Sequence, residues 1–252
     1  MDGFSMSNRS LGRALALIPA KGASQRLTQK NLRSLGGRSL LAWTVRVALA
    51  ANCFDKVVVS TEDEQVAEEA RRLGVEVPFM RPQHLAVDPA GVVEVCLHAL
   101  EQLESNSEQF DTLVILLPSS PFRAVADIKG ALDRYLESQA NFLMSVSKIE
   151  HSPLSSLILD QRGFLKPLHP EWIDRLGAKA KPGKIPDLVR SNGAITIVDI
   201  KQFQKEKRYY AYPLAAYEMP WLRGLDIDTE QDILFGEFLL ERSLIKEEKL
   251  LQ

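Results

Sequence analysis

The chain has 252 residues, of which 45% are hydrophobic and 25% are charged, and its formal net charge at pH 7 is -2. This composition is typical of a soluble globular protein with enough apolar material for a core. It excludes a general nucleic-acid-binding protein, which would carry a basic surface, and two cysteines exclude a disulfide framework. Because no segment has the roughly 20 apolar residues of a membrane span, we expect a cytoplasmic protein without a membrane or nucleic-acid partner.

Residues 1–13 are polar and are predicted to form a flexible tail ahead of one domain over residues 14–245. In this domain, short runs rich in Val, Ile and Leu alternate with helical patterns, which is typical of βαβ units and of a mostly parallel sheet covered on both faces. The runs predict strands at residues 14–18, 56–60, 75–79, 112–117, 142–147 and 194–198. Apolar residues at helical spacing predict helices near 41–49 and 66–73, the latter ending before Gly74, and at 92–103, 126–138 and 229–244.

Residues 151–189 interrupt this rhythm, because they contain five prolines and scattered cations but little periodicity. We interpret this segment as an insertion. Insertions in α/β enzymes often carry substrate contacts or subunit contacts, and a surface loop without a function is the alternative.

The first predicted strand runs directly into a loop that combines glycine, serine and cations. The loop reads Ala20-Lys-Gly-Ala-Ser24 and continues to Arg26 and Lys30. Backbone N–H groups and positive charge at the end of a strand suit an anion such as a polyphosphate. The pattern favours a nucleotide site, and a plain βα turn with solvated charges is the alternative.

A second polar motif, Leu225-Asp-Ile-Asp-Thr-Glu230, lies near the C-terminus. In an extended chain, Asp226 and Asp228 lie on one side while Leu225 and Ile227 face the other. Two aligned carboxylates suit Mg²⁺, which prefers oxygen ligands. Alternatively, Asp228 or Thr229 caps the helix that follows.

Short blocks follow one another along the chain in a defined order. They include the loop that ends at Lys30-Asn31, then Leu117-Pro-Ser-Ser-Pro-Phe-Arg123, Arg190-Ser-Asn-Gly-Ala-Ile195 and Asp226-Ile-Asp-Thr-Glu230. In this order they resemble the N-acylneuraminate (sialic acid) cytidylyltransferase family. The resemblance implies an α/β, three-layer, Rossmann-like nucleotide-diphospho-sugar transferase fold with a mostly parallel sheet. It also implies a reaction in which CTP and a nonulosonic acid give the CMP-sugar and pyrophosphate.

The resemblance assigns roles to individual residues of this chain. Asp226 and Asp228 bind Mg²⁺ and, with Lys21 and Lys30, form the catalytic set. Further nucleotide contacts come from Ala20, Gly22, Ala23, Ser24, Arg26, Asn31, Arg81 and Ser119. Sugar contacts come from His151, Arg190 and Asn192, and the insertion reaches toward a second subunit in a homodimer.

The sequence also departs from the family pattern. Lys21 replaces an Arg, Gln25 replaces a Lys, Leu117 replaces a Gln, and Gly91 and Val92 replace a Ser pair. Several of these changes lie on the sugar side, so we expect an altered sugar, for example a legionaminate-like acid, or weakened activity. Two alternatives remain: a Kdo-type or other sugar nucleotidyltransferase, suggested by Ala23-Ser-Gln-Arg-Leu27, or a catalytically impaired nucleotide-binding homologue.

Overall fold

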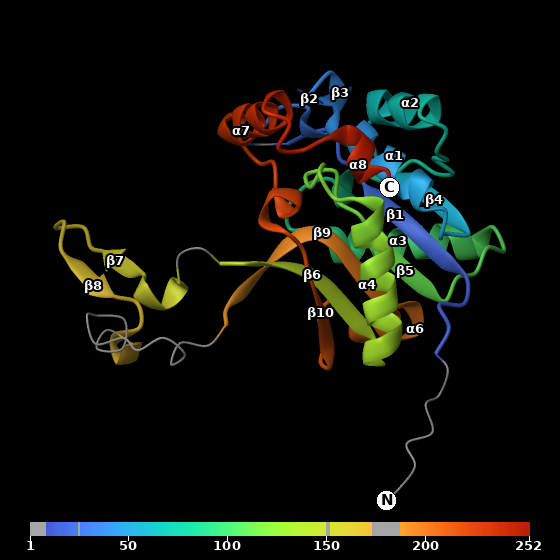
Figure 1. Cartoon of the computed structure of the whole chain (residues 1–252). Helices are drawn as coiled ribbons and strands as arrows, with labels where there is room; N and C mark the ends of the chain where they lie inside the picture. Colours follow the sequence, from blue (N-terminus) through green and yellow to red (C-terminus); the bar gives the residue numbers. More distant parts are fainter. Residues whose placement is uncertain (1–8, 25, 150–151, 173–186) are drawn as a thin grey trace, which may run out of the picture. The chain divides into compact units, whose positions relative to one another are not determined.

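The computed structural model describes residues 9–24, 26–149, 152–172 and 187–252 (Figure 1). These residues divide into two compact units, one made of Met1–Val146 with Asn192–Gln252 and the other of Ser147–Ser191. The predicted insertion, 151–189, falls within the second unit, and we describe each unit by itself.

A six-stranded sheet forms the centre of the first unit. Its order is β10 (Leu214–Glu218), β6 (Phe142–Lys148), β9 (Val189–Asp199), β5 (Thr112–Ile115), β1 (Ala14–Pro19) and β4 (Lys56–Ser60). Strand β1 pairs in parallel with both β4 and β5, and β10 pairs in parallel with β6. Strand β9 pairs antiparallel with β5. The prediction of a mostly parallel sheet is therefore confirmed.

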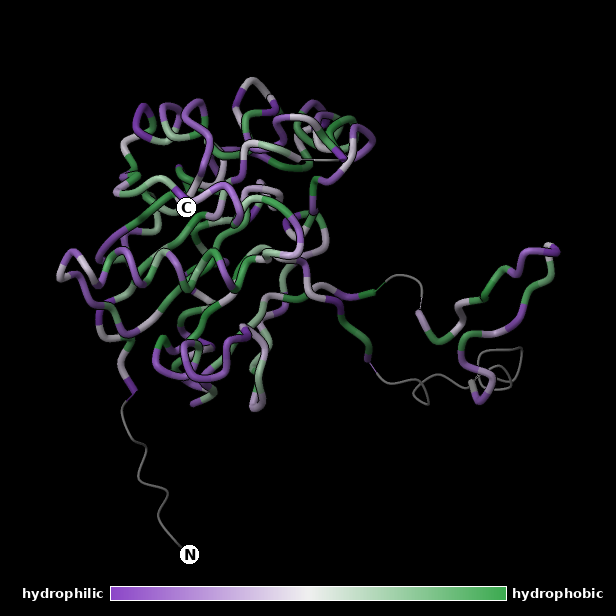
Figure 2. The backbone as a smooth tube through the Cα atoms, turned by 180° about the vertical axis from the view of Figure 1, so that it is seen from behind, coloured by the Kyte–Doolittle hydropathy of each residue, from purple (hydrophilic) through white to green (hydrophobic). Residues whose placement is uncertain are grey.

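Helices cover both faces of the sheet. Along β1, Ala16 and Ile18 belong to one apolar cluster and Leu15 and Leu17 to another, as the alternation of a strand requires. The first cluster receives side chains from α1 (Leu40–Ala51), α2 (Glu64–Arg72), α4 (Val125–Ser138) and α7 (Glu230–Glu241), and the second from α3 (Val92–Ser105) and α6 (Ile200–Glu206). This is the predicted three-layer arrangement, and Figure 2 shows how hydrophobic the central strands are.

Smaller elements complete the first unit. A short hairpin of β2 (Ser34–Leu35) and β3 (Arg38–Ser39) precedes α1, and α8 (Glu247–Leu250) ends the chain. Single turns of 3-10 helix span Lys30–Leu32, Gln83–Leu85 and Trp221–Gly224.

Two predictions about helix ends are confirmed. Gly74 follows α2 with a φ of 84°, a left-handed conformation that glycine adopts readily. At α7, Thr229 rather than Asp228 is the N-cap, and its side chain accepts from the backbone N–H of Asp232. The cap and the proposed role of Asp228 therefore do not compete.

The strand predicted at 75–79 is wrong. The structure forms only isolated bridges there, from Glu76 to Val58 and from Met80 to Thr61. Pro78 lies between them and has no backbone N–H to donate, so a continuous ladder beside β4 cannot form. The segment nevertheless runs along β4 and brings Arg81 to the edge of the sheet, where its N–H donates to Thr61 O at 2.8 Å.

The second unit contains a hairpin of β7 (Leu157–Leu159) and β8 (Leu165–Pro167), with 3-10 turns at Pro153–Ser155 and Pro170–Trp172. Its turn is fixed by Asp160, whose Oδ1 accepts from the N–H groups of Arg162 and Phe164, both at 2.9 Å. Across the parts of the chain that the structure describes, we find no helix long and apolar enough to cross a membrane.

Candidate functional site

A pocket of about 230 Å³ lies where β1 and β5 end. Parallel strands present their carboxyl ends at one edge of the sheet, and ligands of α/β proteins commonly bind at this edge. Five of the residues predicted to contact a nucleotide line the pocket: Lys21, Lys30, Asn31, Arg81 and Ser119. Leu85, Ala86, Val92, Val95 and Leu117 add an apolar wall. The pocket therefore combines cations with a surface on which a flat ring can pack.

The loop after β1 is held in place by its backbone. Ala20 N–H donates to Ser60 O at 2.9 Å, and the Asn31 side chain donates to Lys21 O at 2.7 Å. Asn31 is buried, so it braces the loop as well as lining the pocket. Lys21 and Ala23 are exposed, and Ser24 is half-exposed.

Gly22 has a steric role in this loop. A Cβ atom at this position would lie 2.2 Å from Asp63 Oδ2 and 2.5 Å from Asp63 Cβ, and Asp63 is the N-cap of α2. The Gly22 N–H donates to Glu62 Oε1 at 2.7 Å. In this structure, that amide is therefore used within the protein, and glycine allows the loop to approach α2 closely.

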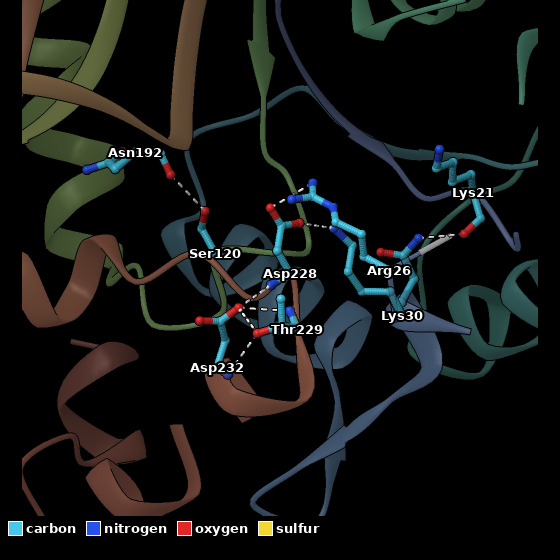
Figure 3. A network of polar contacts seen from close by, with 9 residues as sticks. Lys21, Arg26, Lys30, Ser120, Asn192, Asp228, Thr229 and Asp232 are labelled. Atoms are coloured by element: carbon cyan, nitrogen blue, oxygen red, sulfur yellow. Dashed lines mark hydrogen bonds and ion pairs between the residues drawn. The ribbon is translucent and has the colours of Figure 1, made fainter. Parts of the chain in front are cut away.

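Two cations of the loop pair with one carboxylate (Figure 3). Lys30 Nζ lies 3.0 Å from Asp228 Oδ1, and Arg26 Nη2 lies 2.8 Å from Asp228 Oδ2. The side chain of Arg26 is 69% exposed, whereas that of Lys30 is 19% exposed. Because exposed ion pairs are weak, Lys30 is the better-placed partner of the acidic motif.

Unlike Asp228, which pairs with two cations, Asp226 has a buried Oδ1 with no hydrogen-bond partner among the described residues. Burial raises the pKa of this carboxyl; a hydrogen bond from Ser119 opposes the rise, the charge of Asp228 adds to it, and Lys30 opposes it. The segment is extended and is tied to the pocket by Ile227, whose N–H donates to Ser119 O at 2.7 Å.

The donor set fits a hard divalent cation. An orphaned carboxylate oxygen next to a second carboxylate is a pair of oxygen ligands, and Mg²⁺ is usually bound by one or two carboxylates together with substrate phosphates. Over the described ranges, no group of three or more metal-ligating side chains gathers. Asp226 and Asp228 would thus hold the cation only with oxygens from a ligand or from water.

Two buried residues of the site were missed from the sequence. The side chain of Glu62 is 4% exposed and that of Arg81 is 2% exposed, and the two form an ion pair. Arg123 is fully buried, and its Nη2 donates to Leu117 O and to Ser120 O. Burial lowers the pKa of Arg123 to about 9, and the charges of Asp127 and Asp226 oppose this. Arg123 therefore fixes the loop that carries Ser119. Glu62 could have been suspected from the sequence, because it is a polar residue that closely follows a buried strand.

The three residues predicted to contact the sugar do not come together in one described site. Asn192 is buried; its Oδ1 accepts from Ser145 Oγ at 2.6 Å, and its carbonyl accepts from Ser120 Oγ at 3.2 Å (Figure 3). Arg190 is exposed and belongs to the second unit, and His151 lies outside the described residues. The sugar contacts of all three stay predictions.

Comparisons with solved structures place the fold in a known class. The chain superposes on CMP:2-keto-3-deoxy-manno-octonic acid synthetase complexed with CTP with a TM-score of 0.65 and 15% identity, covering 92% of this chain and 99% of that one. It also superposes on the 4-diphosphocytidyl-2C-methyl-D-erythritol synthase of Anaerococcus prevotii with a TM-score of 0.61 and 12% identity, covering 92% and 100%. These likenesses show that the chain shares the fold of both proteins.

Sequence comparisons identify the family. A cytidylyltransferase family model matches residues 15–179. The chain is 33% identical over 230 residues to the CMP-N,N'-diacetyllegionaminic acid synthase of Legionella pneumophila, covering 91% of this chain and 97% of that protein. It is 26% identical over 225 residues to the pseudaminic acid cytidylyltransferase of Campylobacter jejuni, covering 89% and 95%. It is 29% identical over 224 residues to the N-acylneuraminate cytidylyltransferase of Streptococcus agalactiae, covering 87% and 51%. The chain belongs to the cytidylyltransferase family.

Proposed function

We propose that this protein transfers CMP from CTP to a nonulosonic acid, with release of pyrophosphate. The observation that carries the proposal is one cluster in which the Lys30 ammonium, the Asp228 carboxylate and the orphaned Asp226 oxygen adjoin a mixed polar and apolar pocket. Cations beside a pair of carboxylates suit a triphosphate with its divalent ion, and nucleotidyl transfer depends largely on positioning and on charge stabilisation.

In this proposal, Lys21 and Lys30 bind the triphosphate, and Arg26 and Ser24 stabilise it from the rim of the loop. Lys30 exchanges its partner Asp228 for a phosphate oxygen when the nucleotide arrives. Asp226 and Asp228 would hold Mg²⁺, which when bound would neutralise phosphate charge and polarise the α-phosphoryl group.

We propose a legionaminic-type acid as the first sugar to test. The chain is 33% identical to a CMP-N,N'-diacetyllegionaminic acid synthase and 26% identical to a pseudaminic acid cytidylyltransferase, each over most of its length. By contrast, the likeness to the synthetase for 2-keto-3-deoxy-manno-octonic acid has 15% identity and concerns the fold alone.

The test is pyrophosphate release from CTP and Mg²⁺ with legionaminate, pseudaminate, N-acetylneuraminate and Kdo, with ATP, GTP and UTP as controls. We expect release with CTP and one nonulosonate. If no sugar supports release while calorimetry shows CTP binding, the protein either uses a sugar outside this panel or is a nucleotide-binding homologue. If CTP does not bind either, the proposed function is wrong.

We also propose that the protein is a homodimer formed through the hairpin of the second unit. Leu157, Leu159, Phe164 and Leu165 are more than half exposed there, and Leu159 reaches 67%. Exposed apolar clusters of this kind mark contact surfaces. Light scattering should give twice the monomer mass for the wild type and the monomer mass for Leu159→Glu. The matched control Leu234→Glu changes a leucine that is 69% exposed on α7 and should leave the dimer intact.

A further inference from the structure

Glu62 is a buried acid next to the pocket that does not line it. Its Oε1 accepts from Gly22 N–H at 2.7 Å, and its Oε2 accepts from Arg81 Nε at 3.2 Å and from Arg81 Nη2. The loop after β1 and the segment that follows residues 75–80 thus meet on a single carboxylate. A carboxylate with no access to the pocket acts on a ligand only through the groups it holds.

The pair fixes which edge of the Arg81 guanidinium faces a ligand. Glu62 takes the side formed by Nε and Nη2, and the Arg81 backbone is anchored by its N–H to Thr61 O. Nη1 has no hydrogen-bond partner among the described residues, while Arg81 lines the pocket. The end of the guanidinium, Nη1 and the second N–H of Nη2, is therefore the edge that remains for a ligand.

This edge selects its ligand by chemistry, because a guanidinium only donates hydrogen bonds. Cytosine presents two adjacent acceptors, O2 and N3. Uracil has the same O2, but its N3 carries a hydrogen and would set one donor against another. A buried polar site left unpaired by the wrong ligand discriminates strongly.

We propose that Glu62 is a positioning residue of the nucleotide pocket, which orients Arg81 so that the pocket prefers cytosine to uracil. The inference rests on the proposed function, and it goes further by assigning base selectivity to a residue that does not touch the base. The same carboxylate holds the Gly22 amide, so it also links the base end of the pocket with the phosphate loop.

Glu62→Gln separates these two contacts. The glutamine oxygen still accepts from Gly22, but its amide NH₂ faces the donors of Arg81 and cannot hold them. We expect the Kd for CTP to rise by about 10-fold or more while the Kd for UTP changes little, because the loss of a hydrogen bond to a charged group has roughly that effect. Calorimetry with CTP and UTP, without any sugar, measures both.

The matched control is Asp127→Asn. Asp127 is also a buried carboxylate with an arginine and a backbone amide: it accepts from Arg223 Nε at 2.8 Å, from Arg223 Nη2 at 2.9 Å and from Ala124 N–H at 2.9 Å. Neither Asp127 nor Arg223 lines the pocket. Both variants should lower the melting temperature, but only Glu62→Gln should change the CTP to UTP ratio.

The outcomes separate this inference from the function on which it rests. If the wild type binds CTP and Glu62→Gln keeps the wild-type ratio of CTP to UTP affinity, the inference is wrong and the function stands. If the wild type binds no CTP, the function itself fails. Should Glu62→Gln not fold, Arg81→Lys keeps the charge without the fork, and an unchanged ratio in that variant would equally overturn the inference.

Discussion

The ionised carboxylate of Asp226 should destabilise the ligand-free protein. Its Oδ1 is buried without a hydrogen-bond partner in the described part of the chain, and burial together with the charge of Asp228 raises its pKa. A group whose carboxyl pKa is raised by folding destabilises the fold at neutral pH, where it is ionised. Asp226→Asn removes this charge and keeps the shape, so the variant should be more stable than the wild type and inactive.

The size of the effect follows from the environment of the side chain. An unpartnered buried polar group costs about 1–3 kcal/mol, and because asparagine keeps a polar atom in the same place, Asp226→Asn relieves only the part of this cost that comes from the charge. Ser119 and Lys30 offset part of this, and the residue is partly exposed, so we expect about 1 kcal/mol. For a chain of this size, that corresponds to a rise in Tm of roughly 2–4 °C.

Asp232, four residues after Asp228, gives the matched control, because the same Asp→Asn change there should shift the Tm in the opposite direction. Burial alone would raise the pKa of Asp232, but hydrogen bonds from Asp228 N–H and from the side chain and N–H of Thr229 hold it below its usual value. Asp232→Asn should therefore lower the Tm while Asp226→Asn raises it.

The assay is thermal unfolding at pH 7 with and without Mg²⁺. A ligand at ten times its Kd stabilises a protein by about 1.4 kcal/mol, so Mg²⁺ should raise the Tm of the wild type but not that of Asp226→Asn. A lower Tm for Asp226→Asn, or equal responses of the two proteins to Mg²⁺, would refute the reasoning.

Three further predictions concern the same region. Lys30→Ala should reduce turnover by about 100-fold or more, because it removes the charge that we propose binds the triphosphate. Arg33→Ala breaks an exposed ion pair and should leave turnover near wild type in the same pyrophosphate assay. Gly22→Ala should cost about 1–3 kcal/mol in denaturant unfolding, since the new Cβ overlaps Asp63; wild-type stability would show that the loop can move away. The pKa of Asp232 is lowered in the folded state, so the stability that its carboxylate contributes is present above pH 3.8 and is lost as the pH falls. The difference in Tm between the wild type and Asp232→Asn should therefore shrink in acid, and a difference that grows would contradict this.

The fold was predictable because its signals are local and repeated. Apolar runs of strand length alternate with amphipathic helices, and both faces of a parallel sheet need apolar cover, so the layers follow from the pattern. The segment 75–79 shows the limit: its apolar side chains resemble a strand, but Pro78 removes a donor, and only the three-dimensional pairing shows that the ladder fails.

The site was predictable where its chemistry depends on spacing alone. Asp226 and Asp228 alternate with a buried Ile227, so the two carboxylates emerge together wherever the segment packs. Glu62 could not be assigned in this way, because its partners lie 19 residues later and 40 residues earlier in the chain. A charged residue can be buried only with partners, and when the fold supplies them from distant segments, the sequence shows the charge without showing what holds it. Glu62 is therefore missed because its partners come from distant segments, whereas Asp226 and Asp228 can be predicted from their own spacing.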